Sequence, residues 1–154
     1  MSSERTHEKN RLPGRSARAR DRGAQRSNRV WTMLMIALGA AAGANLRYAL
    51  SLWAARQWGA AFPYGTLLIN VAGSFAIGVV MVLLTTRFTT GDFWRPLLVT
   101  GLLGGFTTFS TFSYETSMLL ISGSWLAAGL NMLASVGLGL FGVFLGAGLA
   151  RLIA

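Results

Sequence analysis

Four apolar stretches, each long enough to cross a bilayer, constrain this chain more than any other feature. They cover residues 31–54, 63–86, 94–121 and 125–150, and an α-helix needs roughly 20 residues to span the hydrocarbon core. Only 12% of the 154 residues are charged, 53% are hydrophobic, and the mean hydropathy is +0.49, which is far from the balance of a soluble domain. The sequence therefore predicts an all-α integral membrane protein with four transmembrane helices in one domain, residues 31–154.

The segments between these stretches are short and contain turn residues. Pro63 opens the second stretch, Gly91 and Asp92 precede the third, and Gly123 precedes the fourth. Tryptophans stand at or near the ends of the stretches, where amphipathic rings settle at the level of the lipid headgroups. They are Trp31, Trp53, Trp58, Trp94 and Trp125. With four spans, both termini are expected on the same side of the membrane.

The first 30 residues have a different composition. They hold nine basic and three acidic residues, which is +6 of the chain's net charge of +9, and almost no large apolar side chains. Such a segment cannot bury enough surface to offset the loss of chain entropy, so residues 1–30 are predicted to be disordered. Its arginines suit an anionic lipid surface; nucleic-acid binding and a cleavable signal peptide are not expected.

Basic residues are distributed unequally between the two sides. The tail, Arg87, Arg95 and Arg151 fall on one side, whereas Arg56 falls on the other. Because cytoplasmic segments are enriched in Lys and Arg, this bias predicts a cytoplasmic N-terminus. The expected location is the plasma membrane.

A run of hydroxyl-bearing side chains lies in the middle of the third stretch, directly after Gly104-Gly105-Phe106. It surrounds Phe109 and Phe112 and consists of Thr107, Thr108, Ser110, Thr111, Ser113 and Tyr114. In hydrocarbon an unpaired backbone amide costs several kcal/mol, so irregular backbone survives there only where protein buries it or a cavity solvates it. The run therefore predicts a broken third helix at a binding site or a permeation path.

Polar residues also follow one face of the second stretch. Thr66, Asn70 and Gly73 recur at helical spacing, with Ser74 beside them. One interpretation is a helix interface in which Asn70 donates an interhelical hydrogen bond. The other is that its amide, which has two donors, faces a path for anions. The spacing leaves both open.

The fourth stretch carries a stripe of small residues. It consists of Ser135, Gly139, Gly142 and Gly146, and Asn131 lies one turn before it. Close helix packing is the better explanation for the glycines. Asn131 and Ser135 are the better candidates for lining a path.

Arg47 and Glu115 are charged residues inside the stretches. The stem of Arg47 can reach the interface, or its guanidinium can raise the local anion concentration in a vestibule. An intramembrane carboxylate is a functional hypothesis by default, although Glu115 can equally brace the helix break. The edges of Phe109 and Phe112 are electropositive, so flanking hydroxyls and ring edges together suit a partly dehydrated halide better than a cation.

Together these residues resemble the Fluc (CrcB) fluoride channels. The likeness covers residues 39–48, 63–78, 101–115 and the helix around Ser135, so it includes all four stretches and omits the tail. The string Gly104-Gly105-Phe106-Thr107-Thr108-Phe109-Ser110-Thr111-Phe112-Ser113 is highly specific.

The resemblance implies an antiparallel dimer with two narrow anion pores and a central sodium ion that is structural and not transported. The carbonyl oxygens of Gly104 and Thr107 from both subunits would coordinate the sodium, consistent with the preference of hard cations for oxygen ligands. The implied pore residues are Phe109, Phe112, Asn70, Ser110, Thr111, Ser135 and, near the vestibule, Arg47. Glu115 matches the acid that usually ends the motif.

The implied activity is passive export of cytoplasmic fluoride, which reduces its toxicity. Hydrogen fluoride enters as a neutral weak acid, ionises and is trapped, and a channel lets the anion leave down the membrane potential. Fluoride is costly to dehydrate, so donors and ring edges must replace its water shell without holding it too tightly.

Two features depart from the family pattern. Asn131 stands where a tyrosine is expected, which removes a phenolic donor. The basic tail favours a single orientation, whereas a homodimer of opposed subunits needs a chain that inserts both ways. The charge bias therefore favours a heterodimer with an oppositely oriented homologue over a homodimer.

Two other functions compete with a channel. A small proton-coupled multidrug exporter needs a central acid, usually in the first helix, and residues 31–54 contain none. A non-conducting membrane subunit would use the hydroxyl run for packing. An enzyme is not expected, because the chain has no cysteine, its single histidine is His7 in the tail, and no base lies in plausible reach of a serine.

Overall fold

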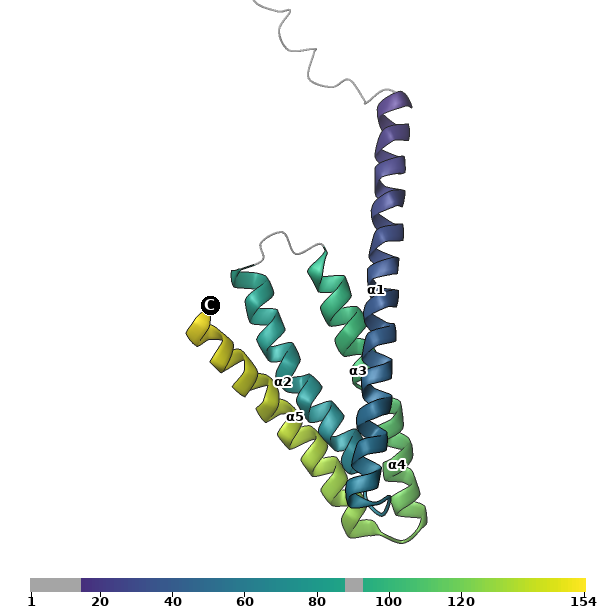
Figure 1. The fold of residues 1–154 in the computed structure, drawn as a ribbon, viewed down its shortest axis with the longest axis vertical. Coiled ribbons are helices and arrows are strands. Elements are labelled where there is room, and N and C mark those ends of the chain that lie inside the picture. Colours follow the sequence, from purple (N-terminus) through teal and green to yellow (C-terminus); the bar gives the residue numbers. More distant parts are fainter. Residues whose placement is uncertain (1–14, 88–92) are drawn as a thin grey trace, which may run out of the picture. The chain divides into compact units, whose positions relative to one another are not determined.

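The computed structural model describes residues 15–87 and 93–154, with side chains described from Ser27 onward and at Gln25. All regular structure in these residues is helical. The elements are α1 (Arg15–Trp58), α2 (Tyr64–Thr86), η2 (Pro96–Leu103), α3 (Gly104–Phe106), α4 (Phe109–Ile121) and α5 (Trp125–Ile153) (Figure 1). The chain divides into two compact units, residues 1–31 and 32–154, and everything that follows on packing concerns the second.

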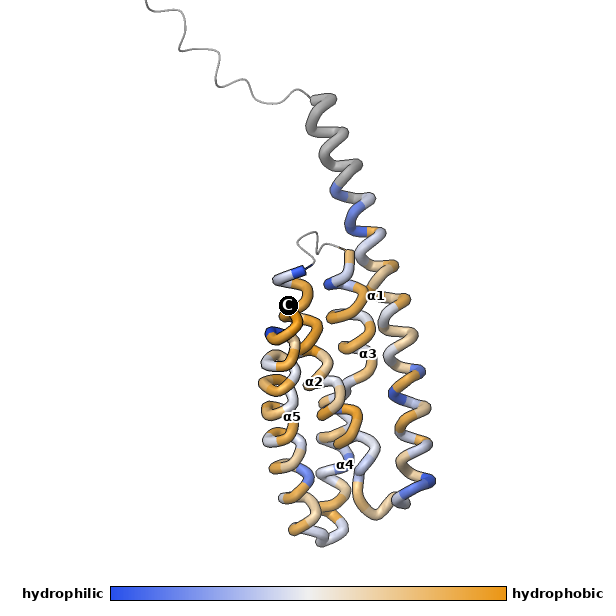
Figure 2. Tube along the Cα trace, turned by 60° about the vertical axis from the view of Figure 1, so that its left-hand side comes forward, coloured by the Kyte–Doolittle hydropathy of each residue, from blue (hydrophilic) through white to orange (hydrophobic). Residues whose placement is uncertain are grey.

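Three continuous helices are long and apolar enough to cross a membrane. They are Ser27–Trp58, Tyr64–Thr86 and Trp125–Ile153, with mean hydropathies of 1.3, 2.5 and 2.0. Figure 2 shows apolar residues along most of α2 and α5. The remaining predicted span, residues 94–121, is divided among η2, α3 and α4 and does not form one continuous helix.

Helix α1 begins at Arg15, so residues 15–30 are helical where the composition predicts disorder. Arginine and alanine supply more than half of this segment, and both have high helix propensity. The predictions for residues 1–14, and for the turn at Gly91 and Asp92, fall outside the described residues.

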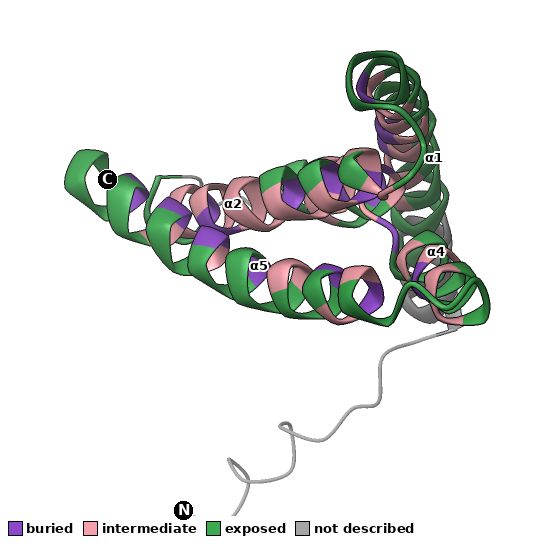
Figure 3. Cartoon of the chain, turned by 90° about the horizontal axis from the view of Figure 1, so that it is seen from below, coloured by how far each residue is buried: buried purple, intermediate pink, exposed green. Residues whose placement is uncertain are grey.

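Helices α2 and α5 pack closely because glycines lie at their crossing. A Cβ atom on Gly78 would collide with the carbonyl oxygen of Val143, and one on Gly146 would collide with that of Phe75. Figure 3 shows that buried residues of α5 face α2 while its other faces are exposed. The interpretation of Gly146 as a packing residue is therefore confirmed.

Glycines also join α1 to η2 and α3, a contact that the sequence analysis does not predict. Gly39 and Gly43 of α1 pack on the backbone of Leu97 and Leu102, and Gly101 lies against α1 in turn, where a Cβ atom would come within 2.9 Å of the Gly39 Cα atom. Small residues four apart on both partners allow two backbones to approach, as in transmembrane helix pairs.

The two ends of the second unit differ in charge. Arg87 follows α2 and donates hydrogen bonds from Nε to the Ala154 oxygen at 3.1 Å and from Nη2 to the Ile153 oxygen at 2.6 Å. A cation beside these carbonyl groups also complements the dipole of α5. Because the helices alternate in direction, Arg95 and Arg151 lie at this same end and Arg56 lies at the other (Figure 1).

Candidate functional site

The third predicted span is interrupted at two residues with extended backbone. Thr107 has φ −83° and ψ 156°, and Thr108 has φ −152° and ψ 117°. Helix α3 ends at Phe106, and α4 begins at Phe109. The eight residues of η2 before the break form a π-helix, a rare form that is frequent near functional sites. The helix break that the hydroxyl run predicts is present, a few residues beyond the glycine pair.

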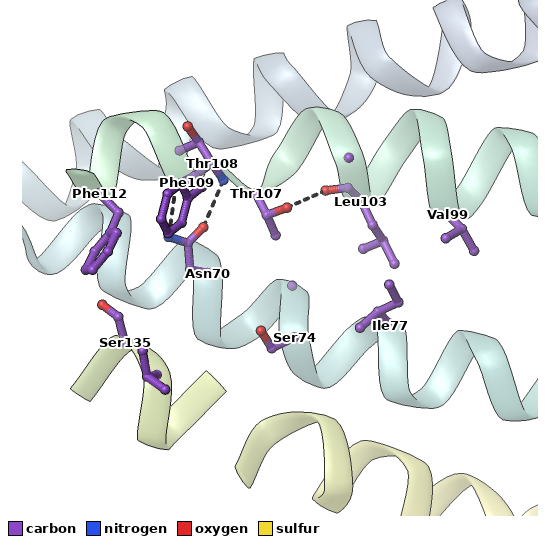
Figure 4. Close-up of a pocket in the computed structure, with 13 residues that line it drawn as sticks. Asn70, Ser74, Ile77, Val99, Leu103, Thr107, Thr108, Phe109, Phe112 and Ser135 are labelled. Atoms are coloured by element: carbon purple, nitrogen blue, oxygen red, sulfur yellow. Dashed lines mark hydrogen bonds between the residues drawn. The ribbon is translucent and has the colours of Figure 1, made fainter. Parts of the chain in front are cut away.

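Asn70 of α2 binds both backbone groups of Thr108. Its Nδ2 donates to the Thr108 carbonyl oxygen at 3.1 Å, and its Oδ1 accepts from the Thr108 N–H at 2.9 Å (Figure 4). Buried backbone groups need such partners where a helix is interrupted. The interhelical hydrogen bond proposed for Asn70 is thereby confirmed, and the side chain also lines the pocket described below.

In a continuous helix, the backbone N–H groups of Thr108 and Thr111 would bind two carbonyl groups of the preceding turn. Here both N–H groups bind side chains instead. The Thr108 N–H, which would bind the Gly104 oxygen, is donated to Asn70 at 2.9 Å. The Thr111 N–H, which would bind the Thr107 oxygen, is donated to the Thr108 Oγ1 at 3.3 Å. The carbonyl oxygens of Gly104 and Thr107 thus lose their regular i+4 partners.

Thr108 is the N-cap of α4 and the centre of a hydroxyl cluster. Its Oγ1 lies 3.2 Å from the Ser110 Oγ and 3.1 Å from the Thr111 Oγ1. A threonine at this position stabilises the first turn by satisfying an orphan N–H group. The sequence places Thr108 in the hydroxyl run but does not reveal its role as a cap, although a threonine directly before a helix start is a recognisable capping signal.

A pocket of about 400 Å³ lies at the break, between α2, the third-span segments and α5. Its polar residues are Asn70, Ser74, Thr107, Thr108 and Ser135, and its aromatic residues are Phe109 and Phe112. The two rings lie with centroids 5.6 Å apart and planes at 44°. The pocket therefore joins four predicted pore residues: the two phenylalanines, Asn70 and Ser135.

The hydroxyl of Ser135 is a free donor within this pocket. Its Oγ is buried and has no hydrogen-bond partner among the described residues. Figure 4 shows the hydroxyl pointing toward Phe112. A buried polar group without a partner is unusual in a folded protein and calls for an explanation such as a ligand, an ion or water.

Other predicted residues lie elsewhere. Ser110 and Thr111 are exposed beside the cap, and Arg47 is half-buried on α1, outside this pocket. Glu115 lines a second pocket of about 480 Å³ together with Thr66. The Oε2 atom of Glu115 is buried without a partner in the described part of the chain. Asn131 is buried and lines neither pocket.

Several known proteins are similar to this chain in sequence. The family model described as "CrcB-like protein, Camphor Resistance (CrcB)" matches residues 34–147. A protein of Roseiflexus sp. (strain RS-1) named "Fluoride-specific ion channel FluC" is 66% identical over 121 residues, which is 79% of this chain and 98% of that relative.

More distant relatives carry the same name. The protein of Chloroflexus aurantiacus (strain ATCC 29366 / DSM 635 / J-10-fl) is 56% identical over 119 residues, 77% of this chain and 94% of the relative. The protein of Shewanella oneidensis (strain MR-1) is 46% identical over 114 residues, 74% of this chain and 91% of the relative. The resemblance seen in the sequence is confirmed, and the chain belongs to the CrcB family.

Proposed function

We propose that this chain forms a fluoride-specific channel through which cytoplasmic fluoride leaves passively, so that its toxicity is reduced. Relatives at up to 66% identity are named fluoride-specific ion channels. The observation that carries the proposal is the pocket at the helix break, where two phenylalanine rings, an asparagine amide and a serine hydroxyl without a partner among the described residues come together.

The donors of this pocket suit an anion that has lost part of its water. The Ser135 hydroxyl has no other partner among the described residues, and Asn70 Nδ2 uses one of its two hydrogens on Thr108. Ring edges of Phe109 and Phe112 add weak positive potential. Weak donors in series replace hydration without trapping the ion, which is the condition for conduction.

A second subunit would complete the pore. Phe109 is 79% exposed, and Ser110 and Thr111 beside it are exposed as well, so a single chain leaves part of the proposed fluoride path open. The proposed assembly is an antiparallel dimer in the plasma membrane, either with a second copy or with a homologue of opposite charge bias. The arginines at one end support a cytoplasmic N-terminus and thereby favour the heterodimer.

Sodium would lie between the two helix breaks of the dimer, held by the Gly104 and Thr107 carbonyl oxygens. Both oxygens lose their regular helical donors, and hard cations prefer oxygen ligands. No group of three or more His, Cys, Asp or Glu side chains gathers in the described residues, so backbone oxygens fit the role better than side chains. The ion would brace the break and would not be transported.

Two charged side chains would act at the pore mouths. Arg47 would raise the fluoride concentration by its field. Glu115 lines the second pocket together with Thr66, and this pocket would form part of the vestibule next to the helix break.

Fluoride efflux from liposomes that contain only the purified chain tests the proposal. A potassium ionophore sets the voltage, and chloride is the comparison anion. Fluoride efflux with negligible chloride efflux is expected from the assembled channel, whether the chain pairs with itself or with a homologue, and Phe112→Ala should slow it at least about tenfold, equivalent to ~1.4 kcal/mol in the barrier. The control is Phe141→Ala, which truncates an exposed ring on α5 outside the pocket.

The outcome also decides the assembly. Fluoride flux from the chain alone would establish a homodimer and contradict the heterodimer. If the chain alone is silent, co-expression with a homologue of opposite charge bias should restore flux, and silence of both would contradict the channel.

A further inference from the structure

A chain of hydrogen bonds connects the interior of α5 to the carbonyl group of Phe112. The Asn131 Nδ2 donates to the Thr116 Oγ1 at 2.8 Å. The Thr116 hydroxyl in turn donates to the Phe112 carbonyl oxygen at 2.7 Å. Each bond polarises the next in a low-dielectric interior, so such chains are stronger than their separate members.

Both side chains of this relay are buried between α4 and α5. Asn131 is 1% exposed and Thr116 is 6% exposed. Ala128, one turn before Asn131, is fully buried as well. A buried amide in this position is costly unless it has a partner, so Asn131 selects the rotation of α4 that presents the Thr116 hydroxyl.

That rotation also sets the position of an aromatic ring. Phe112 lies one turn before Thr116 on the same face of α4, and its side chain lines the pocket at the break, whereas Asn131 does not reach that pocket. Helix α4 has only 13 residues and begins directly after the extended pair Thr107 and Thr108. Beyond the cap at Thr108, the buried bond from Asn131 to Thr116 is therefore a contact that sets the angle of α4 about its axis.

We infer that Asn131 is a positioning residue, which holds Phe112 in the fluoride path through the hydroxyl of Thr116. The effect of this relay on fluoride flux rests on the proposed function, whereas its hydrogen bonds do not. It differs from the expectation that Asn131 lines the path, because the amide is turned to α4 and away from the pocket. Asn131 and Thr116 act as a pair, and neither contributes to ring placement without the other.

Fluoride efflux of paired variants tests the relay. Asn131→Leu and Thr116→Val keep the number and branching of the side-chain heavy atoms and remove the hydrogen bonds. Each should lower efflux by about threefold to fifteenfold, the span of coupling measured for interhelical hydrogen bonds in membranes. The double variant should be no slower than the slower single variant, and Thr116→Ser should restore efflux. Full additivity of the two losses would overturn the pairing.

The matched control is Ser117→Ala. Ser117 is exposed on α4 beside Thr116, and its hydroxyl donates to the Tyr114 carbonyl oxygen at 2.7 Å. It therefore has the same kind of bond within the helix, and its truncation should leave efflux unchanged. A loss equal to that of Thr116→Val would mean that α4 is generally sensitive, and would overturn the relay.

A fluorine NMR measurement separates the relay from the proposed function. Phe112 is replaced by 4-fluorophenylalanine in the full chain, and the ring resonance is recorded in detergent. Asn131→Leu and Thr116→Val should move or broaden it alike, whereas Ser117→Ala should not. If neither the chain alone nor the chain co-expressed with a homologue conducts fluoride, yet the resonance responds, the relay stands and the channel proposal fails. An unchanged resonance in both variants would overturn the relay even in a conducting protein.

Discussion

Asn70 shows how one side chain can support an irregular backbone inside a membrane. Its amide group is both donor and acceptor, so it pairs with the Thr108 N–H and carbonyl groups at once. An arginine or a serine could not do both with the same geometry. The same contacts free the carbonyl oxygen of Gly104, so the helix break and the proposed sodium ligand have one origin.

Asn70→Ala should lower the free energy of unfolding by about 2 kcal/mol, because it leaves the Thr108 N–H buried without a partner. Thermal or denaturant unfolding in detergent measures the change. The control is Asn45→Ala, since the exposed Asn45 donates to the Ala41 carbonyl oxygen of its own helix, at 2.8 Å. Equal losses in the two variants would contradict the role assigned to Asn70.

The sequence predicts where polar side chains such as Asn70 lie on their helices, but it does not predict which groups they bind. Helical spacing placed Asn70 on the face of Thr66 and Gly73, and the structure confirms its interhelical bond. Spacing alone did not reveal that the partner is backbone, because the extended conformation of Thr108 depends on α4 and α5 as well. The pairing of Asn131 with Thr116 was missed because these residues lie on helices whose relative rotation no local pattern specifies.

At the scale of elements, two glycine contacts hold the helices of residues 32–154 together. Gly78 and Gly146 join α2 to α5, and Gly39 and Gly43 join α1 to η2 and α3. Lipid tails are as apolar as leucine, so close van der Waals packing replaces the hydrophobic effect as the force between helices. These contacts fix α2 against α5 and α1 against the two elements that precede the break.

Gly78→Ala should lower the free energy of unfolding by about 2 kcal/mol, because the new Cβ forces α2 away from the Val143 backbone. Gly148→Ala is the matched control: no atom lies within 4 Å of its added Cβ, so higher helix propensity should leave stability unchanged or raise it by up to about 1 kcal/mol. If Gly148→Ala were the more damaging substitution, the packing assignment would be wrong.

The apolar pattern predicted α2 and α5 well because long hydrophobic segments in lipid have almost no alternative to a helix. It predicted a break in the third span from hydroxyl content, and the structure has one. It did not predict the π-helix of η2, since an apolar stretch of this length does not distinguish a π-helix from an α-helix. Residues 15–30 are helical, although their high charge predicts disorder. Their arginines and alanines have high helix propensity, which favours the helix.

At the scale of the whole molecule, the surface of residues 32–154 has two main features, which are exposed apolar side chains and an uneven distribution of charge. Leu126, Leu133 and Phe144 on α5 are exposed apolar side chains, as expected where lipid or another subunit covers a helix. Arginines gather at the end of residues 32–154 that carries the C-terminus. An antiparallel dimer of identical chains would place this charge on both sides of the membrane, against the positive-inside bias.

Single-cysteine labelling should therefore find one orientation. The chain has no cysteine, so Ser124→Cys, in the turn before α5, and Thr86→Cys, at the end of α2, each provide one target. A membrane-impermeant maleimide should label Ser124→Cys in intact cells and Thr86→Cys only after permeabilisation. Comparable labelling of both in intact cells would contradict the single orientation and the heterodimer that follows from it.

The most direct test of a passive fluoride-specific channel is the reversal potential in a planar bilayer that contains the dimer, under a tenfold fluoride gradient with symmetric chloride. A passive pore for a monovalent ion predicts reversal about 59 mV from zero at 25 °C, the tenfold value for one charge, with no change when a pH gradient is added. A reversal that follows the proton gradient would indicate coupled exchange, and a reversal near zero would indicate no selectivity. Either result would contradict the channel proposed here.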